Sequence, residues 1–142
     1  MVEPGTIEHF GQILSHVVAP AFLLGAVASF TSILLARVEK VLDRMRVIND
    51  IPPEGHSKSV LRADIPRLKR RLHLLNSSLY LSIWSGIVAG VLIIGAFVAA
   101  LLSITHVWGA AVAFTLSMAL LCLSLFVFAM EVRISLSEND QL

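Results

Sequence analysis

Three long stretches without Asp, Glu, Lys or Arg dominate this sequence and limit what it can fold into. They run from about Phe10 to Ala36, from Leu79 to Leu102 and from Trp108 to Met130. A helix needs about 20 mostly apolar residues to cross about 30 Å of hydrocarbon, so each stretch is long enough. None shows the alternation of apolar and polar residues that marks the strands of a membrane barrel. The sequence therefore predicts an all-α integral membrane protein with three transmembrane helices.

Composition agrees with this class and argues against an enzyme. Of the 142 residues, 56% are hydrophobic and 15% are charged, whereas a soluble domain has about 45–50% and about 25%. The sequence contains no P-loop, no GxSxG, no HExxH and no Rossmann glycine pattern. The nearest pair of histidines, His9 and His16, would lie about 10 Å apart along a helix, too far to share one metal ion. We therefore expect no enzyme activity, no cofactor and no metal site.

The distribution of basic residues predicts the orientation. All 11 Lys and Arg residues follow the first apolar stretch, and all but Arg133 lie between Arg37 and Arg71. Positive residues are retained on the cytoplasmic side of a membrane, so we expect the N-terminus outside and the C-terminus in the cytoplasm. The predicted layout is an extracytoplasmic tail (1–9), transmembrane helix 1 (10–36), a cytoplasmic segment (37–78), transmembrane helix 2 (79–102), an extracytoplasmic turn (103–107), transmembrane helix 3 (108–130) and a cytoplasmic tail (131–142).

The cytoplasmic segment has the pattern of a helical hairpin. Apolar residues alternate at spacings of three and four from Leu34 to Ile48, and again from Leu61 to Leu79, which marks one side of a helix. A strong breaker, residues 49–55, separates the two runs, so we place the turn at about 49–58. Asp64 suits the N-cap of the second arm and Pro66 its first turn. Helices 1 and 2 are thus expected to extend into the cytosol as an antiparallel hairpin, whose seam packs locally or also binds a second subunit or another protein.

A basic cluster on the second arm suggests contact with anionic lipid headgroups. It consists of Arg67, Lys69, Arg70 and Arg71. Basic residues next to a membrane helix attract anionic lipids, although retention of topology alone would also explain them. The cluster lacks a nucleic-acid reading module and interleaved aromatic residues, so we expect no nucleic-acid partner. At the end of the third span, Glu131 is expected to pair with Arg37 or another basic residue.

Small residues recur on one face of each predicted span. Span one carries Ala21, Gly25, Ser29, Ser32 and Ala36, span two carries Gly86, Gly90 and Gly95, and span three carries Ala113 and Ser117. Small residues let helix backbones approach closely in lipid, so the faces predict tight packing. Packing within the chain and homo-oligomerisation both explain them, and we expect a homo-oligomer. The hydroxyl-bearing stripe of span one is also a candidate pore lining.

Three sequence blocks together resemble a known family. Leu-Leu-Ala-Arg-Val-Glu-Lys-Val-Leu-Asp-Arg-Met-Arg (34–46) follows the first span, Arg-Leu-Lys-Arg-Arg-Leu-His-Leu-Leu (67–75) leads into Leu-Tyr-Leu-Ser (79–82), and Glu-Val-Arg-Ile-Ser-Leu (131–136) ends the third span. In this order they resemble the bacterial membrane family "domain of unknown function 2721", over about Ile13–Leu136. The resemblance implies three spans in a bacterial inner membrane. It implies no established activity, and therefore no functional residue.

Two functions agree with these observations. In the first, a homo-oligomer is an ion or small-solute channel whose pore is lined by helix 1. In the second, the chain is a non-conducting scaffold or accessory subunit that binds another membrane protein. The expected partners are membrane lipid, further copies of the chain and, in the second case, another membrane protein.

Overall fold

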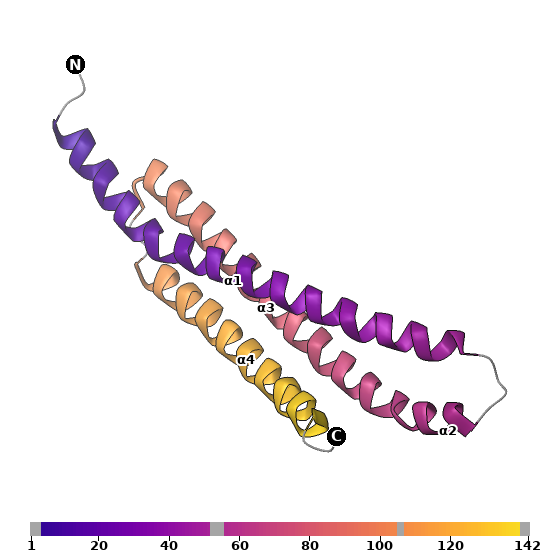
Figure 1. Ribbon diagram of the computed structural model, residues 1–142. Coiled ribbons are helices and arrows are strands. Elements are labelled where there is room, and N and C mark those ends of the chain that lie inside the picture. Colours follow the sequence, from indigo (N-terminus) through magenta and orange to yellow (C-terminus); the bar gives the residue numbers. More distant parts are fainter. Residues whose placement is uncertain (1–3, 52–55, 105–106, 140–142) are drawn as a thin grey trace. The chain divides into compact units, whose positions relative to one another are not determined.

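The computed structural model describes residues 4–51, 56–104 and 107–139 (Figure 1). These residues form α1 (Pro4–Asp50), α2 (His56–Ala63), α3 (Ile65–Leu101) and α4 (Val107–Asn139), and no strand occurs among them. The helices α1, α3 and α4 are each long and apolar enough to cross a membrane. The predicted all-α membrane protein with three transmembrane helices is therefore confirmed. The limits of each span in the bilayer, and the cytoplasmic side of the hairpin, stay predictions.

The charged extensions of the first two spans continue the same helices. α1 runs without interruption to Asp50, through Pro20, and α3 begins at Ile65. The carbonyl of Asp64 accepts a hydrogen bond from the Leu68 amide at 3.0 Å, and Pro66 lies in the first turn, where its missing N–H leaves no helical bond unmade. α3 therefore begins directly after Asp64, the residue that suits its N-cap. Of the predicted 49–58 turn, residues 52–55 lie outside the described residues.

α3 ends in a turn that a serine closes in an unusual backbone conformation. Ser103 has a φ of 54°, in the left-handed region that glycine usually occupies. The Ile104 amide donates to the Ala99 carbonyl at 2.9 Å, and the Ser103 amide donates to the Ala100 carbonyl at 3.2 Å. This pair of bonds is a Schellman motif, which satisfies carbonyls that the end of the helix leaves open. The rest of the predicted 103–107 turn includes residues 105–106, which lie outside the described residues.

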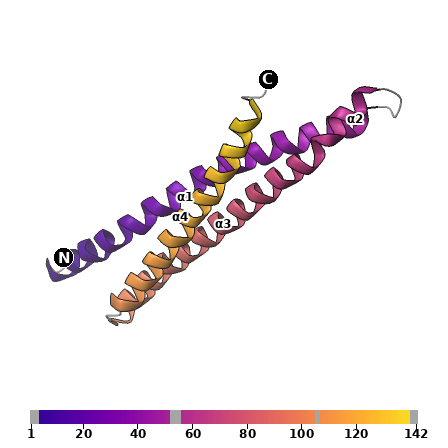
Figure 2. The same cartoon turned by 90° about the horizontal axis from the view of Figure 1, so that it is seen from below.

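The chain forms two compact units, each containing parts of α1, α3 and α4, and unit 2 also contains α2. Unit 1 contains residues 1–30 and 82–122, and unit 2 contains residues 31–81 and 123–142. Within each unit, α3 runs antiparallel to α1 and α4 (Figures 1 and 2). Each unit therefore has the packing of a small three-helix bundle.

The buried apolar residues follow a seven-residue spacing in unit 2. Leu34, Val41 and Ile48 are buried on α1, and Leu68 and Leu75 are buried on α3. These residues belong to the predicted seams, and the other members of those seams are half-buried. A seven-residue repeat keeps one side of a helix against its neighbour over several turns. The α1 and α3 parts of unit 2 thus use the side that the sequence pattern indicates.

Unit 1 has a smaller apolar core and an extensive apolar surface. Its core residues are Leu23, Val27 and Phe30 on α1, Ala89 and Leu92 on α3 and Leu121 on α4. Large apolar side chains such as Phe22, Ile94 and Trp108 are exposed on the same helices. Apolar side chains are stable on an outer surface where hydrocarbon surrounds it. This surface contacts lipid in a multi-pass membrane protein.

Candidate functional site

Two reciprocal serine pairs join α3 to α4. In unit 2, the Ser78 hydroxyl donates to the Ser124 carbonyl at 2.8 Å and the Ser124 hydroxyl donates to the Ser78 carbonyl at 2.6 Å. In unit 1, Ser85 and Ser117 make the same two bonds, both at 2.8 Å. Each hydroxyl has one proton, so the reciprocal bonds use both donors of a pair. All four serines are fully buried. The pairs therefore tie the two backbones together by polar contacts at small side chains.

The third polar contact between these helices is an ion pair. Arg71 and Glu131 lie seven residues from Ser78 and Ser124, respectively, and Ser85 and Ser117 lie seven residues further along. The Arg71 Nε donates to Glu131 Oε1 at 3.0 Å, and its Nη2 donates to the Ser135 hydroxyl at 3.0 Å. Polar residues therefore meet at every seventh position along the α3–α4 pair.

Glu131 also binds the first helix. Arg37 Nη1 donates to Glu131 Oε2 at 3.1 Å, so each carboxylate oxygen accepts from a different arginine. The Glu131 side chain is fully buried, whereas 38% of the Arg37 side chain and 13% of the Arg71 side chain are exposed. The Arg37 guanidinium also stacks over the Phe128 ring, 5.0 Å from its centre. The expected pairing of Glu131 is confirmed, and it joins α1, α3 and α4 in unit 2.

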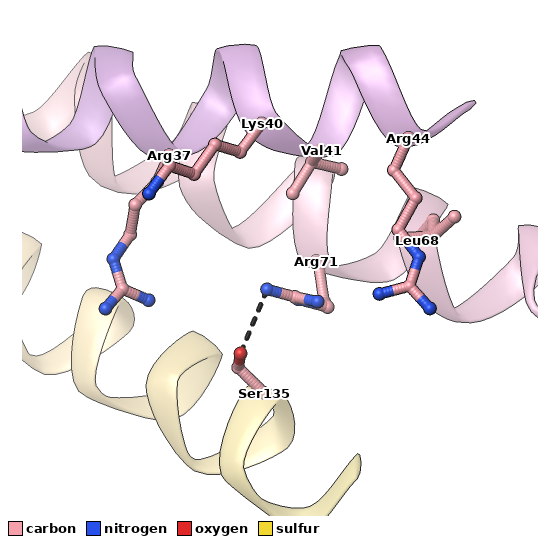
Figure 3. A pocket seen from close by; sticks show the side chains of 7 residues that line it. All are labelled: Arg37, Lys40, Val41, Arg44, Leu68, Arg71 and Ser135. Carbon is pink, nitrogen blue, oxygen red and sulfur yellow. Dashed lines mark hydrogen bonds between the residues drawn. The ribbon is translucent and has the colours of Figure 1, made fainter. Parts of the chain in front are cut away.

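A cationic pocket lies beside this ion-pair cluster in unit 2. It has a volume of about 320 Å³ and is lined by Arg37, Lys40, Val41 and Arg44 of α1, Leu68 and Arg71 of α3 and Ser135 of α4 (Figure 3). Four of the seven lining residues are cationic. Arg37 and Arg71 are held by the Glu131 carboxylate. Among the described residues, Lys40 and Arg44 make no ion pair. The pocket therefore combines two arginines held in place with two further cations that have no ion-pair partner among the described residues.

The predicted basic cluster is divided in the structure. Arg67, Lys69 and Arg70 are exposed on α3, whereas Arg71 is half-buried and bonded to α4. One of the four candidate lipid contacts is therefore a structural ion-pair partner as well. The other three have the exposure that contact with headgroups requires.

The small residues of α1 lie on its outer surface. Ala21, Gly25, Ser29, Ser32 and Ala36 are all exposed. A Cβ added at Gly25 would have no neighbour within 4 Å, and the Ser29 hydroxyl donates to the Gly25 carbonyl at 3.0 Å. A shallow hollow in unit 1 includes Ala21, Gly25 and Ser29 on its wall. This face makes no close packing contact at Gly25 within the described chain.

The small residues of the other spans differ among themselves. A Cβ at Gly86 would lie 3.1 Å from Cγ1 of Val27, so this glycine permits close packing of α3 on α1 in unit 1. A Cβ at Gly90 or Gly95 would meet nothing within 4 Å. Ala113 is half-buried on α4, and Ser117 forms one of the serine pairs.

Sequence reasoning did not identify Ser78 and Ser85 or assign Arg71 to Glu131. The signal was present as a seven-residue recurrence of polar residues on two helices: 71, 78 and 85 on one, and 117, 124 and 131 on the other. A polar residue at every second turn of an apolar helix predicts polar contact with a neighbouring helix. Among the residues that the structure describes, no three His, Cys, Asp or Glu side chains gather in a way that would hold a metal ion.

Comparison with known families gives a match over most of the chain. Residues 17–140 match the family described as "Protein of unknown function (DUF2721)". Comparison with curated proteins and with solved structures gives no match. The matched residues include most of α1 and all of α2, α3 and α4, and with them both serine pairs and the ion-pair cluster. The chain therefore belongs to the DUF2721 family of proteins of unknown function.

Proposed function

We propose that several copies of the chain assemble in a bacterial inner membrane into an ion channel whose pore is lined by α1. The observation that carries this proposal is the exposure of the small-residue face of α1, from Ala21 to Ala36. Small side chains on a membrane helix allow another backbone to approach closely, but they gain nothing from exposure to lipid. A face that the chain itself leaves open is best explained by neighbouring copies around a common axis.

The same face becomes acidic toward the C-terminal end of α1. Glu39 and Asp43 follow Ala36 at three and seven residues, so the helix repeat places them on the side of the stripe, and both are exposed. Asp43 pairs with Arg46 at 3.5 Å, with most of both side chains exposed, and such a surface pair is weak. In an assembly, these carboxylates would form rings at the cytoplasmic mouth. Rings of Asp or Glu select cations, so we propose a cation channel.

The serines of the stripe suit a narrow aqueous path. The Ser29 hydroxyl donates to a carbonyl of its own helix, and its oxygen keeps lone pairs that can accept from water. No charge interrupts the stripe between Ala21 and Ala36. The proposal gives the protein a role in conduction without a catalysed reaction.

A non-conducting scaffold is the second candidate, and the extracytoplasmic half of the same face favours it. Leu14, Val18 and Phe22 are exposed near the line of the stripe. Large apolar side chains would obstruct water in a pore, but they would suit contact with another membrane protein. In this case the stripe would be the centre of a helix-packing surface.

Two glycine substitutions separate these possibilities from each other. Gly25→Leu fills the stripe, and Gly95→Leu is its matched control, because both glycines are exposed and neither has a neighbour within 4 Å of an added Cβ. Subunit number is measured by native mass spectrometry, and current by recording from planar bilayers. We expect wild type and Gly95→Leu to assemble and conduct, and Gly25→Leu to lose both properties.

The remaining outcomes decide between the candidates. Assembly without current at any voltage or pH would favour the scaffold and exclude the channel. A wild-type chain that stays monomeric in lipid would exclude both the proposed assembly and the pore. If current is present, Glu39→Gln with Asp43→Asn should shift the reversal potential in a salt gradient toward lower cation selectivity. Labelling of single cysteines from either side of the membrane tests the proposed topology, with the N-terminus outside and the C-terminus cytoplasmic.

A further inference from the structure

We propose that the cationic pocket of unit 2 binds the phosphate group of an anion, with an anionic phospholipid headgroup as the expected source. The pocket is lined by four cationic residues from two helices, Arg37, Lys40, Arg44 and Arg71, and by the Ser135 hydroxyl of a third (Figure 3). Basic pockets between membrane helices on the cytoplasmic side are suited to phosphorylated headgroups. The inference does not depend on whether the assembly conducts.

The positive charge of the pocket exceeds what the protein neutralises. Glu131 binds both Arg37 and Arg71. Lys40 and Arg44 make no ion pair with a described residue, so their two positive charges keep no carboxylate partner there. Like charges held close together repel each other, so an anion between them is stabilised by several charges at once.

The geometry is fixed before any anion arrives. Glu131 holds one arginine on each oxygen, and Ser135 holds Arg71 by a second bond at 3.0 Å. Arg37 is further held over the Phe128 ring. Arginines that are already ordered lose little side-chain entropy on binding, and guanidinium groups match the geometry of phosphate oxygens. Arg37 and Arg71 therefore supply a rigid wall of the pocket.

Lys40 and Arg44 supply the adjustable wall. Both are exposed on α1, and neither makes an ion pair with a described residue, so an incoming phosphate does not have to displace an internal partner from them. Val41 and Leu68, which are buried, provide apolar contact for the uncharged part of a ligand. The volume of about 320 Å³ is at the lower end of the range of about 300–1,000 Å³ for small-molecule pockets. One headgroup phosphate is a suitable occupant.

The test compares two pairs of charge removals in the full chain. Lys40→Gln with Arg44→Gln removes two pocket cations, and Arg62→Gln with Arg133→Gln removes two exposed cations of the same unit that neither line the pocket nor belong to the basic cluster of α3. The two variants lower the net charge of the protein by the same amount. A general attraction between basic protein and anionic lipid would therefore weaken to the same extent in each. Binding of fluorescent phosphatidylglycerol is measured in zwitterionic micelles, with phosphatidylcholine as the reference lipid. Circular dichroism shows whether each variant keeps its helices.

We expect the pocket variant to bind phosphatidylglycerol about tenfold or more weakly than wild type, because it loses two charged hydrogen-bond donors to the phosphate. The control variant should stay within about threefold of wild type, and Lys40→Arg with Arg44→Lys should retain binding because charge and donors remain. An equal loss in both charge-removal pairs would overturn the proposal. Unchanged binding in the pocket variant would also overturn it.

A second arm distinguishes a lipid from a soluble source. Inorganic phosphate is added to wild type in micelles, and competition with fluorescent phosphatidylglycerol is measured. If phosphate competes with the lipid in wild type but not in the Lys40→Gln, Arg44→Gln variant, this supports a phosphate site that is open to soluble ligands. Lipid binding without competition supports a headgroup site. If phosphatidylglycerol binds no better than phosphatidylcholine and phosphate has no effect, the pocket has no phosphate ligand.

Discussion

Replacing Glu131 by leucine removes the carboxylate on which Arg37 and Arg71 converge. The two arginines would then lie close together without the negative charge between them. Removing one partner from a buried ion pair typically costs about 3–5 kcal/mol, mostly because the other charge stays buried and unpaired. The Arg37 side chain is 38% exposed and can regain water, whereas Arg71 at 13% cannot easily do so. We therefore expect Glu131→Leu to lower the free energy of unfolding by about 3 kcal/mol, at the lower end of that range.

Removing the whole cluster should have a smaller effect than removing its centre. A triple variant combines Arg37→Met, Glu131→Leu and Arg71→Met. It leaves no buried charge, and its apolar side chains occupy a similar volume. Such replacements of a complete buried cluster are often neutral or stabilising. We expect the triple variant to lie within about 1 kcal/mol of wild type, and hence to be more stable than the single variant. A triple variant that is more stable than the single variant is expected only where the charged cluster is shielded from water.

The assay is unfolding of purified protein in mixed micelles by increasing the fraction of denaturing detergent, followed by circular dichroism. Glu39→Leu is the matched control, because it removes an exposed carboxylate from the same unit. It should change stability by no more than about 0.5 kcal/mol. The reasoning is refuted if Glu131→Leu is as stable as this control, or if the triple variant is less stable than Glu131→Leu.

Further predictions concern the helix contacts. A double-mutant cycle of Ser85→Ala and Ser117→Ala should give a coupling of about 0.6 kcal/mol, and at most about 1.7, as for other hydrogen bonds between membrane helices. Gly90→Ala should stabilise the chain by up to about 1 kcal/mol, because alanine has the higher helix propensity. Gly86→Ala should be less stable than Gly90→Ala by about 1–2 kcal/mol, because the added Cβ at position 86 would lie 3.1 Å from a valine methyl carbon. Ser103→Gly should stabilise the chain by about 1 kcal/mol, because glycine adopts a φ of 54° without steric cost. Unfolding in mixed micelles measures all three, and an unchanged midpoint in Ser103→Gly would contradict the last.

The helices and their seams followed from the sequence because their causes are local. Lipid offers no hydrogen-bond partner to a backbone, so a long apolar stretch has to be helical. The alternation of three and four residues between Leu34 and Ile48 indicates a packed side whatever the partner is. The start of α3 at Asp64 and Pro66 followed for the same reason, since a cap depends on neighbouring residues.

Apart from the pairing of Glu131 with Arg37, the contacts between helices did not follow, because they depend on how far one helix is shifted and rotated against another. Gly86 and Gly90 look equivalent in the sequence, but only Gly86 has a neighbour within 4 Å of an added Cβ. Arg71 looks like a fourth member of a basic cluster, but its place seven residues before Ser78 puts it on the side of α3 that contacts α4. The partner of each buried serine is likewise a property of the α3–α4 alignment.

That alignment has a mechanical consequence. The polar contacts of α3 with α4 repeat every seven residues, about 10 Å along a helix, and the positions between them are mostly apolar. Within each unit, a slide of α4 along α3 by a single turn would break the hydroxyl pair, and in unit 2 it would break the ion pair as well. In unit 2, the Ser78–Ser124 pair and the Arg71–Glu131 ion pair therefore resist axial sliding of α4 along α3, and the Arg37–Glu131 bond ties α1 to the same site.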